Sequence, residues 1–147
     1  MIRKQLDLKI ISNMPKIYVA CDGDWEEPEV QFSGSVKALS DFGKLLNKAE
    51  GHSKWTVPVK KNEHYPVNIE SLSVGCLDSE NDRITVAVNE DILSLEGTPV
   101  ALNKLGDSLV NFFDTETLVG EYFQLDYYDG NQVLNETKCH LIFIRDA

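Results

Sequence analysis

The sequence predicts an α+β fold, with a mainly antiparallel sheet and two helices on one face of it. Three observations lead to this prediction. A ten-residue pattern occurs twice along the chain, each copy has the apolar spacing of an amphipathic helix, and short alternating segments lie on both sides of each copy. Two helices packed on one face of a sheet give a common layered architecture.

The repeated pattern runs from Gly34 to Gly43 and returns 63 positions later, from Gly97 to Gly106. Both copies keep the first glycine, a hydroxyl residue after it, an Ala-Leu pair and the second glycine. We interpret this as an internal duplication of a ββαββ unit, covering about 16–79 and 80–147. Chance similarity between two strand–helix junctions is the alternative.

Two segments before each copy of the repeat are predicted to be extended strands. Residues 16–20 and 30–32 precede the first copy, and residues 83–88 and 92–95 precede the second. In 83–88 polar and apolar residues alternate, which is the period of a half-buried strand. The short turn Asn89-Glu90-Asp91 predicts a hairpin and therefore antiparallel pairing.

Each copy of the repeat is predicted to be a helix, from about Ser35 to Ala49 and from about Thr98 to Phe113. Ser35 and Thr98 are favourable N-caps, and proline is well tolerated at the first helical position, where Pro99 stands. Apolar residues at helical spacing predict one buried face on each helix. These residues are Leu39, Phe42, Leu46 and Ala49 in the first helix, and Leu102, Leu105, Leu109 and Phe112 in the second.

Gly43 and Gly106 fall inside these helices, where glycine costs about 0.8–1 kcal/mol relative to alanine. We expect each helix to pass close to the sheet, or to the other helix, at this glycine.

Further strands are predicted after each helix. They comprise 53–59 and 67–77 in the first half, and 120–128 and 139–145 in the second, with Asp129-Gly130-Asn131 as a turn. In this part the offset between corresponding residues becomes 69, so that Leu72 matches Leu141. Residues 1–15 are a further strand or an arm. The sequence leaves open whether all the strands form one continuous sheet.

Length and composition indicate a single soluble domain, residues 1–147. The formal net charge is -10, of which residues 1–79 carry -1 and residues 80–147 carry -9. An acidic surface opposes binding to nucleic acid and to anionic membranes, whereas it attracts a basic protein. Without an apolar stretch at its start, the sequence shows no signal peptide, and we expect a cytoplasmic protein.

The residue types that carry catalysis do not fall into a known pattern. The three cysteines, Cys21, Cys76 and Cys139, form no C-x-x-C pair and are expected to be reduced and mostly buried. The histidines have no zinc-ligand spacing, and no phosphate-binding or dinucleotide-binding glycine pattern is present. We therefore expect no cofactor, no metal and no enzymatic activity.

An acidic segment between the first two strands is the first candidate binding site. It contains Asp22, Asp24, Trp25, Glu26, Glu27 and Glu29. The first three acidic residues imitate a calcium loop, but Glu27 stands at its sixth position in place of the required glycine. A protein-binding site with Trp25 as its apolar anchor is one interpretation, and a solvated loop whose tryptophan folds onto the core is the other.

The second candidate binding site is rich in tyrosine. It consists of Tyr127, Tyr128 and Asp129, with Tyr122 and Asp126 beside them. Neighbouring residues on a strand point to opposite faces, so we expect one of Tyr127 and Tyr128 to pack inward and the other to face solvent.

The second half resembles the small acidic immunity proteins of bacterial polymorphic and contact-dependent toxin systems. The likeness is carried by Leu95-Glu96-Gly97 leading into Ala101-Leu102-x-x-Leu105, and by the Tyr-rich turn and closing strand of 122–144. The resemblance implies a cytoplasmic protein that blocks a cognate toxin, for which a basic nuclease is one candidate. A small-molecule or regulatory binding module, with a pocket between the two halves, is the second hypothesis. A hydrolase or transferase acting through Cys139, His52 or His64 is the third.

Overall fold

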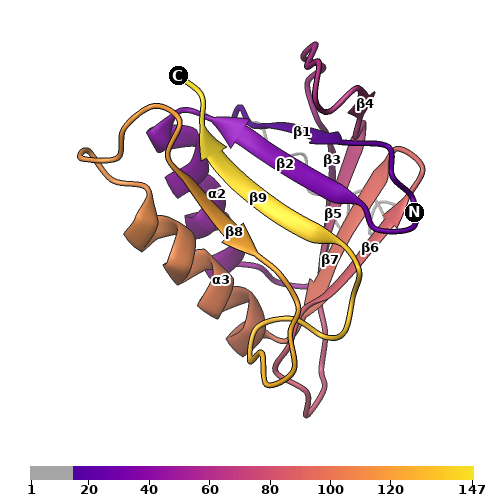
Figure 1. Cartoon of the computed structure of the whole chain (residues 1–147). Helices are drawn as coiled ribbons and strands as arrows, with labels where there is room; N and C mark the ends of the chain where they lie inside the picture. Colours follow the sequence, from indigo (N-terminus) through magenta and orange to yellow (C-terminus); the bar gives the residue numbers. More distant parts are fainter. Residues whose placement is uncertain (1–14) are drawn as a thin grey trace, which may run out of the picture.

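The computed structural model describes residues 15–147, which form two helices and nine strands in an α+β arrangement (Figure 1). The predicted α+β class is therefore confirmed. The possible strand or arm at residues 1–15 lies almost entirely outside the described residues.

The two helices are α2 (Val36–Asn47) and α3 (Pro99–Phe112). Both predicted N-caps are confirmed: Ser35 Oγ accepts a hydrogen bond from the backbone N–H of Ala38, and Thr98 Oγ1 accepts one from Ala101. The predicted apolar faces are also confirmed, because the first three residues of each set are buried. Ala49 lies just beyond the end of α2 and is only partly buried, as is Phe112.

The strands form two separate sheets, each with strands from both halves of the chain. One sheet has the order β4-β1-β2-β9-β8, and we call it sheet A. Its strands are β1 (Tyr18–Cys21), β2 (Glu29–Gly34), β4 (Val67–Asn68), β8 (Tyr122–Leu125) and β9 (His140–Arg145). Sheet B has the order β3-β5-β7-β6. Its strands are β3 (His52–Thr56), β5 (Ser71–Cys76), β6 (Thr85–Asn89) and β7 (Ile92–Gly97).

Most neighbouring strands pair antiparallel, as expected from the short connections, but one pair in each sheet is parallel. In sheet A, β2 and β9 run parallel with Glu29 opposite His140, and in sheet B, β7 and β5 run parallel with Ile92 opposite Ser71. Parallel strands need a long crossover between them. Between β2 and β9 the chain includes both helices and six strands, whereas between β5 and β7 it consists of residues 77–91, which contain only β6.

The order of elements is β-β-α-β-β in the second half, whereas the first half carries the additional short strand β4. The two parallel registers correspond under the offsets of 63 and 69 found in the sequence, since Glu29 corresponds to Ile92 and His140 to Ser71. These features agree with a duplication, which stays a prediction.

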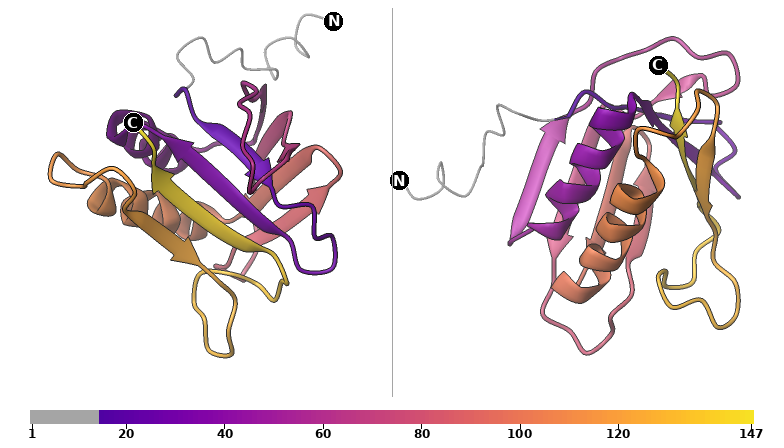
Figure 2. Two further views of the ribbon diagram at one scale, coloured as in Figure 1. Left: turned by 45° about the horizontal axis from the view of Figure 1, so that its top comes forward. Right: turned by 90° about the vertical axis from the view of Figure 1, so that its left-hand side faces the viewer.

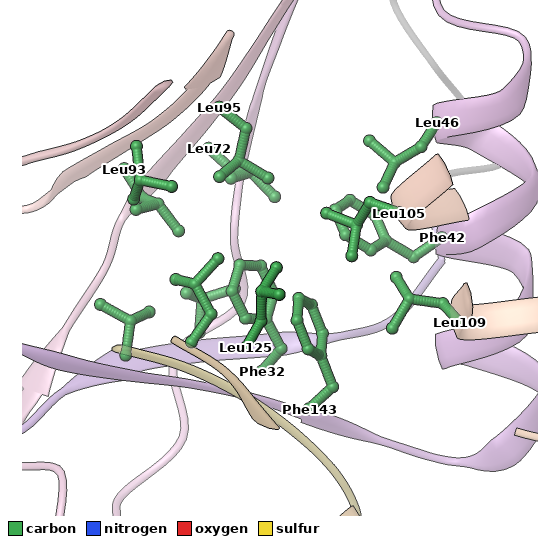
Figure 3. Packing of buried hydrophobic residues seen from close by; sticks show 14 of the residues in the cluster. Phe32, Phe42, Leu46, Leu72, Leu93, Leu95, Leu105, Leu109, Leu125 and Phe143 are labelled. Carbon is green, nitrogen blue, oxygen red and sulfur yellow. The ribbon is translucent and has the colours of Figure 1, made fainter. Parts of the chain in front are cut away.

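The core lies between the two sheets and the pair of helices. Figure 2 shows α2 and α3 side by side, with sheet A and sheet B on either side of them. In Figure 3, Leu72, Leu93 and Leu95 of sheet B face Phe32, Phe143 and Leu125 of sheet A, and the helices contribute Phe42, Leu46, Leu105 and Leu109. All three structural layers therefore share one hydrophobic core.

The helices cross at the two glycines that the repeat contains. A Cβ atom added to Gly43 would lie 2.7 Å from the carbonyl oxygen of Gly106, and one added to Gly106 would lie 2.5 Å from the carbonyl oxygen of Gly43. The expectation of a close approach is confirmed, and the close neighbour is the other helix.

Candidate functional site

The acidic segment predicted from the sequence is the loop between β1 and β2, and its aspartates shape it. The Oδ1 atom of Asp22 accepts hydrogen bonds from the backbone N–H groups of Asp24, at 3.0 Å, and Glu29, at 3.2 Å. The Oδ1 atom of Asp24 accepts from Glu26 and Glu27. Because these carboxylates are engaged by backbone donors, they hold the loop in shape. Among the described residues no group of three or more metal-ligating side chains comes together.

This loop presents Trp25 and Glu26 to solvent. Trp25 is 51% exposed, so it does not fold fully onto the core. The next two residues, Glu26 and Glu27, are also exposed. The structure thus leaves an aromatic ring and two carboxylates available to a partner on the loop that Asp22 and Asp24 hold.

The tyrosine-rich segment lies in the loop after β8 and not in a strand, since β8 ends at Leu125. Buried Asn131 shapes this loop: its Nδ2 donates to the carbonyl oxygen of Asp126, and its Oδ1 accepts from the N–H groups of Val133 and Leu134. The prediction of a strand through residue 128 is therefore wrong, because the buried amide of Asn131 takes the carbonyl group of Asp126, the first residue after β8.

The two tyrosines nevertheless differ in exposure as expected. Tyr127 is partly buried against the core, whereas Tyr128 is 65% exposed. Asp129 is exposed next to Tyr128, and its Oδ1 lies 3.5 Å from the hydroxyl of Tyr127. Tyr128 and Asp129 are the members of this segment that a partner can reach most directly.

His140, at the start of β9, joins the two loops. Its Nε2 lies 2.9 Å from Glu27 Oε1 in the β1–β2 loop, and its Nδ1 lies 2.6 Å from Asp126 Oδ1 at the end of β8. Figure 1 shows both loops at the end of sheet A where β2 and β9 begin. We call the surface formed by Trp25, Glu26, Glu27, Tyr128 and Asp129 the acidic loop surface.

Hydrogen bonds to Glu27 and Asp126 raise the pKa of His140 above its ordinary value. Since each ring nitrogen faces a carboxylate, both carry a proton when the residue is charged. Sequence reasoning did not find this role of His140, because Glu27 is distant along the chain and only the parallel pairing of β2 with β9 brings it near.

We expect replacement of Glu27 by glutamine to lower the pKa of His140 towards its ordinary value, because a charged acceptor is lost. The measurement is an NMR titration of the His140 ring protons, with Glu26→Gln as the control that removes a neighbouring charge without touching the ring.

The raised pKa of His140 also makes the stability of the protein depend on pH. The stabilisation from the His140–Glu27 pair is complete below about pH 6.5, the ordinary pKa of histidine, and is lost as the pH rises through the pKa of His140 in the folded protein. The pair is partly exposed, so we expect this contribution to be less than about 1 kcal/mol. An unchanged His140 pKa in Glu27→Gln would contradict the assignment.

Two cavities lie beside the acidic loop surface. One, of about 530 Å³, is lined by Trp25, Val67, Val88, Asn89, Glu90 and Asp91. The other, of about 610 Å³, lies between α3 and the β8–β9 loop and includes Asp126, Tyr128 and Asn131 in its lining. The first cavity takes residues from both halves of the chain.

An apolar patch at the opposite end of β8 was not anticipated from the sequence. Leu118, Val119 and Tyr122 are all more than half exposed there. Tyr122 was singled out in the sequence as part of the tyrosine-rich segment, whereas Leu118 and Val119 fall between the predicted helix and the predicted strand 120–128 and were not. This patch lies in the loop before β8 and at the first residue of β8.

The residues of the third hypothesis do not assemble into a catalytic group. Burial is the main cause that raises the pKa of Cys139, to about 12, so this thiol stays protonated near neutral pH. Buried Cys21 also has a raised pKa, chiefly through desolvation, while Cys76 is partly buried. His52 lies beside Gly75 on sheet B, and His64 is exposed in the loop before β4.

Comparison of the chain with protein families, with curated proteins and with solved structures finds no match. Neither α2 nor α3, the helices of residues 15–147, has the length and apolar character needed to cross a membrane.

Proposed function

We propose that this protein is an immunity protein, which binds a cognate bacterial toxin and neutralises it by covering a basic surface. The observation that carries the proposal is the link through His140, which combines two acidic loops with exposed aromatic residues into one surface. Exposed tryptophan and tyrosine surrounded by charge are typical of the residues that dominate protein–protein binding energy.

The charge of the chain supports a basic partner. A net charge of -10 accelerates encounter with a positively charged surface and opposes encounter with nucleic acid. A nuclease fits as the toxin because a cleft that binds nucleic acid must be basic. The protein would act in the cytoplasm without cofactor or metal, and it would act by occlusion rather than catalysis.

The test is a complex with the toxin domain encoded by the gene next to this one. We expect a stable 1:1 complex by size-exclusion chromatography with light scattering, and protection of cells that express both proteins. Absence of both the complex and the protection would exclude the proposal.

Charge reversal locates the interface. We expect Glu26→Lys to weaken the complex roughly tenfold, mainly through slower association, since it places a positive charge on the acidic loop surface. Glu116→Lys is the matched control, because it makes the same change of charge in the exposed loop before β8, beside the apolar patch. Surface plasmon resonance at two salt concentrations measures both variants. If Glu116→Lys weakened the complex more than Glu26→Lys, the interface would instead lie at the apolar patch of Leu118, Val119 and Tyr122.

A small-molecule or regulatory binding module is the second candidate function, and one observation favours it. The cavity beside Trp25 lies between the two halves, as that hypothesis requires, and its volume is within the range of ligand sites. Thermal-shift screening separates the candidates, since a metabolite that stabilises the protein in the absence of any toxin supports this second one.

A further inference from the structure

The cavity beside Trp25 combines an apolar wall with an acidic rim. Trp25 comes from the β1–β2 loop, Val67 from β4 and Val88 from β6, while Glu90 and Asp91 form the turn between β6 and β7. No lysine, arginine or histidine is among the described residues that line it. An occupant of this cavity therefore meets hydrocarbon, an indole ring and negative charge.

Asp91 lines the cavity, and the carboxyl group of Glu70 lies next to that of Asp91. A hydrogen bond with Asp91, and the charge of Asp91, raise the pKa of Glu70, the residue just before β5. The turn is held against this residue, because the carbonyl oxygen of Asp91 accepts hydrogen bonds from the backbone N–H groups of Glu70 and Ser71. A positive charge placed beside these carboxyl groups relieves their mutual repulsion.

Glu90 adds a third carboxylate at an unusual backbone position. Its φ is 57°, a left-handed conformation that glycine and asparagine adopt at a lower steric cost than glutamate. A glutamate in this conformation costs about 1–2 kcal/mol relative to glycine, so the turn carries a charge at the cavity at the expense of stability. Tight hairpin turns require a positive φ, and residues held in sparsely populated backbone regions also cluster at functional sites.

We infer that this cavity receives a lysine or arginine side chain of the protein partner. The proposal rests on the proposed function and names the part of the partner that enters. The aliphatic stem of the side chain packs on Val67 and Val88, and its charged end lies against the indole of Trp25 and the carboxylates of Glu90 and Asp91. Tryptophan is the aromatic residue that attracts cations most strongly, and a charged head on an apolar stem matches the two halves of the lining. Trp25 also belongs to the acidic loop surface, so one partner can contact both.

The first arm of the test uses side-chain analogues and needs no toxin. N-acetyl-arginine amide is titrated into the full chain, with N-acetyl-norleucine amide as the uncharged control of similar length. We expect the NMR signals of the Trp25 indole and the Val88 methyl groups to shift with the arginine derivative alone. The double variant Glu90→Gln, Asp91→Asn should abolish these shifts, whereas Glu116→Gln should leave them unchanged. No shift, or equal shifts with the norleucine derivative, would overturn the inference.

The second arm uses the complex with the toxin domain. We expect Trp25→Leu and the double variant Glu90→Gln, Asp91→Asn each to weaken the complex about tenfold, while Trp25→Phe retains most of the affinity. If the complex forms and none of these variants matters, the inference fails and the proposed function stands. If the arginine derivative binds in the cavity but no toxin does, the proposed function fails and the cavity takes a small cation instead, which also overturns the inference.

Discussion

Replacing Phe143 by alanine is expected to destabilise the protein by about 3–5 kcal/mol, the usual cost of removing a large aromatic side chain from a core. Phe143 is fully buried in β9, and its ring stacks on Phe32 of β2 with 4.5 Å between ring centroids. Phe123 of β8 flanks the same ring, 6.0 Å away. The variant therefore loses contacts with both neighbouring strands of sheet A, β2 and β8.

Urea unfolding followed by tryptophan fluorescence measures this loss. Small domains have unfolding free energies of about 5–15 kcal/mol, so the variant should unfold at a clearly lower urea concentration or fail to fold. Phe143→Leu is the milder variant that keeps the measurement possible. Tyr122→Ala is the control, since it removes an exposed ring from β8 and should change stability by less than about 0.5 kcal/mol. Equal effects of Phe143→Ala and Tyr122→Ala would show that β9 does not lie in the core.

The second large effect is expected at the helix crossing. Gly106→Ala places a methyl group 2.5 Å from the carbonyl oxygen of Gly43 and against the side chain of Asn47. Backbone atoms cannot rotate away, so the helices must separate, and overpacking of this kind costs about 1–3 kcal/mol. Elsewhere in a helix the same replacement would be stabilising by about 1 kcal/mol. A loss of stability in Gly106→Ala therefore indicates that the two helices are in close contact at this residue, whereas a gain indicates that they are not.

A double-mutant cycle makes this prediction sharper. Gly43→Ala and Gly106→Ala each push the same two helices apart, so one displacement relieves both, and the double variant should cost less than the sum of the single ones. Asn103→Ala is the control, because Asn103 is exposed on α3 and its replacement should be neutral or slightly stabilising. Strict additivity, or a stabilising Gly106→Ala, would contradict the close approach.

The sequence predicted the local features of the fold well. Ser35, Thr98 and the apolar residues of α2 and α3 act within one or two helical turns, so their roles can be read from spacing alone. The paired glycines were recognised for the same reason, since each occupies the same position in its own helix. The strands were placed to within a few residues, apart from the short β4 and the early end of β8.

The arrangement of the strands could not be derived in this way. Whether β2 pairs with β9 depends on residues that are far apart in sequence, and alternation along a strand does not name its neighbour. The end of β8 was misjudged because Asn131, outside the strand, competes for its backbone. The candidate site also combines local features, which the sequence shows, with a long-range contact, which it does not. The members of each loop were visible in the sequence, whereas their connection through His140 depends on the long-range pairing.

The exchange of strands between the halves also bears on how the chain acquires its shape during translation. When residues 16–79 have left the ribosome, β2 still lacks β9 on one side, and β5 lacks β7. A nascent chain of this length has two unsatisfied sheet edges, which are prone to pair with other chains. Non-local pairing of this kind is also slow to form. We therefore expect that a chaperone accompanies the emerging first half, and that halting synthesis before β9 leaves a species that aggregates.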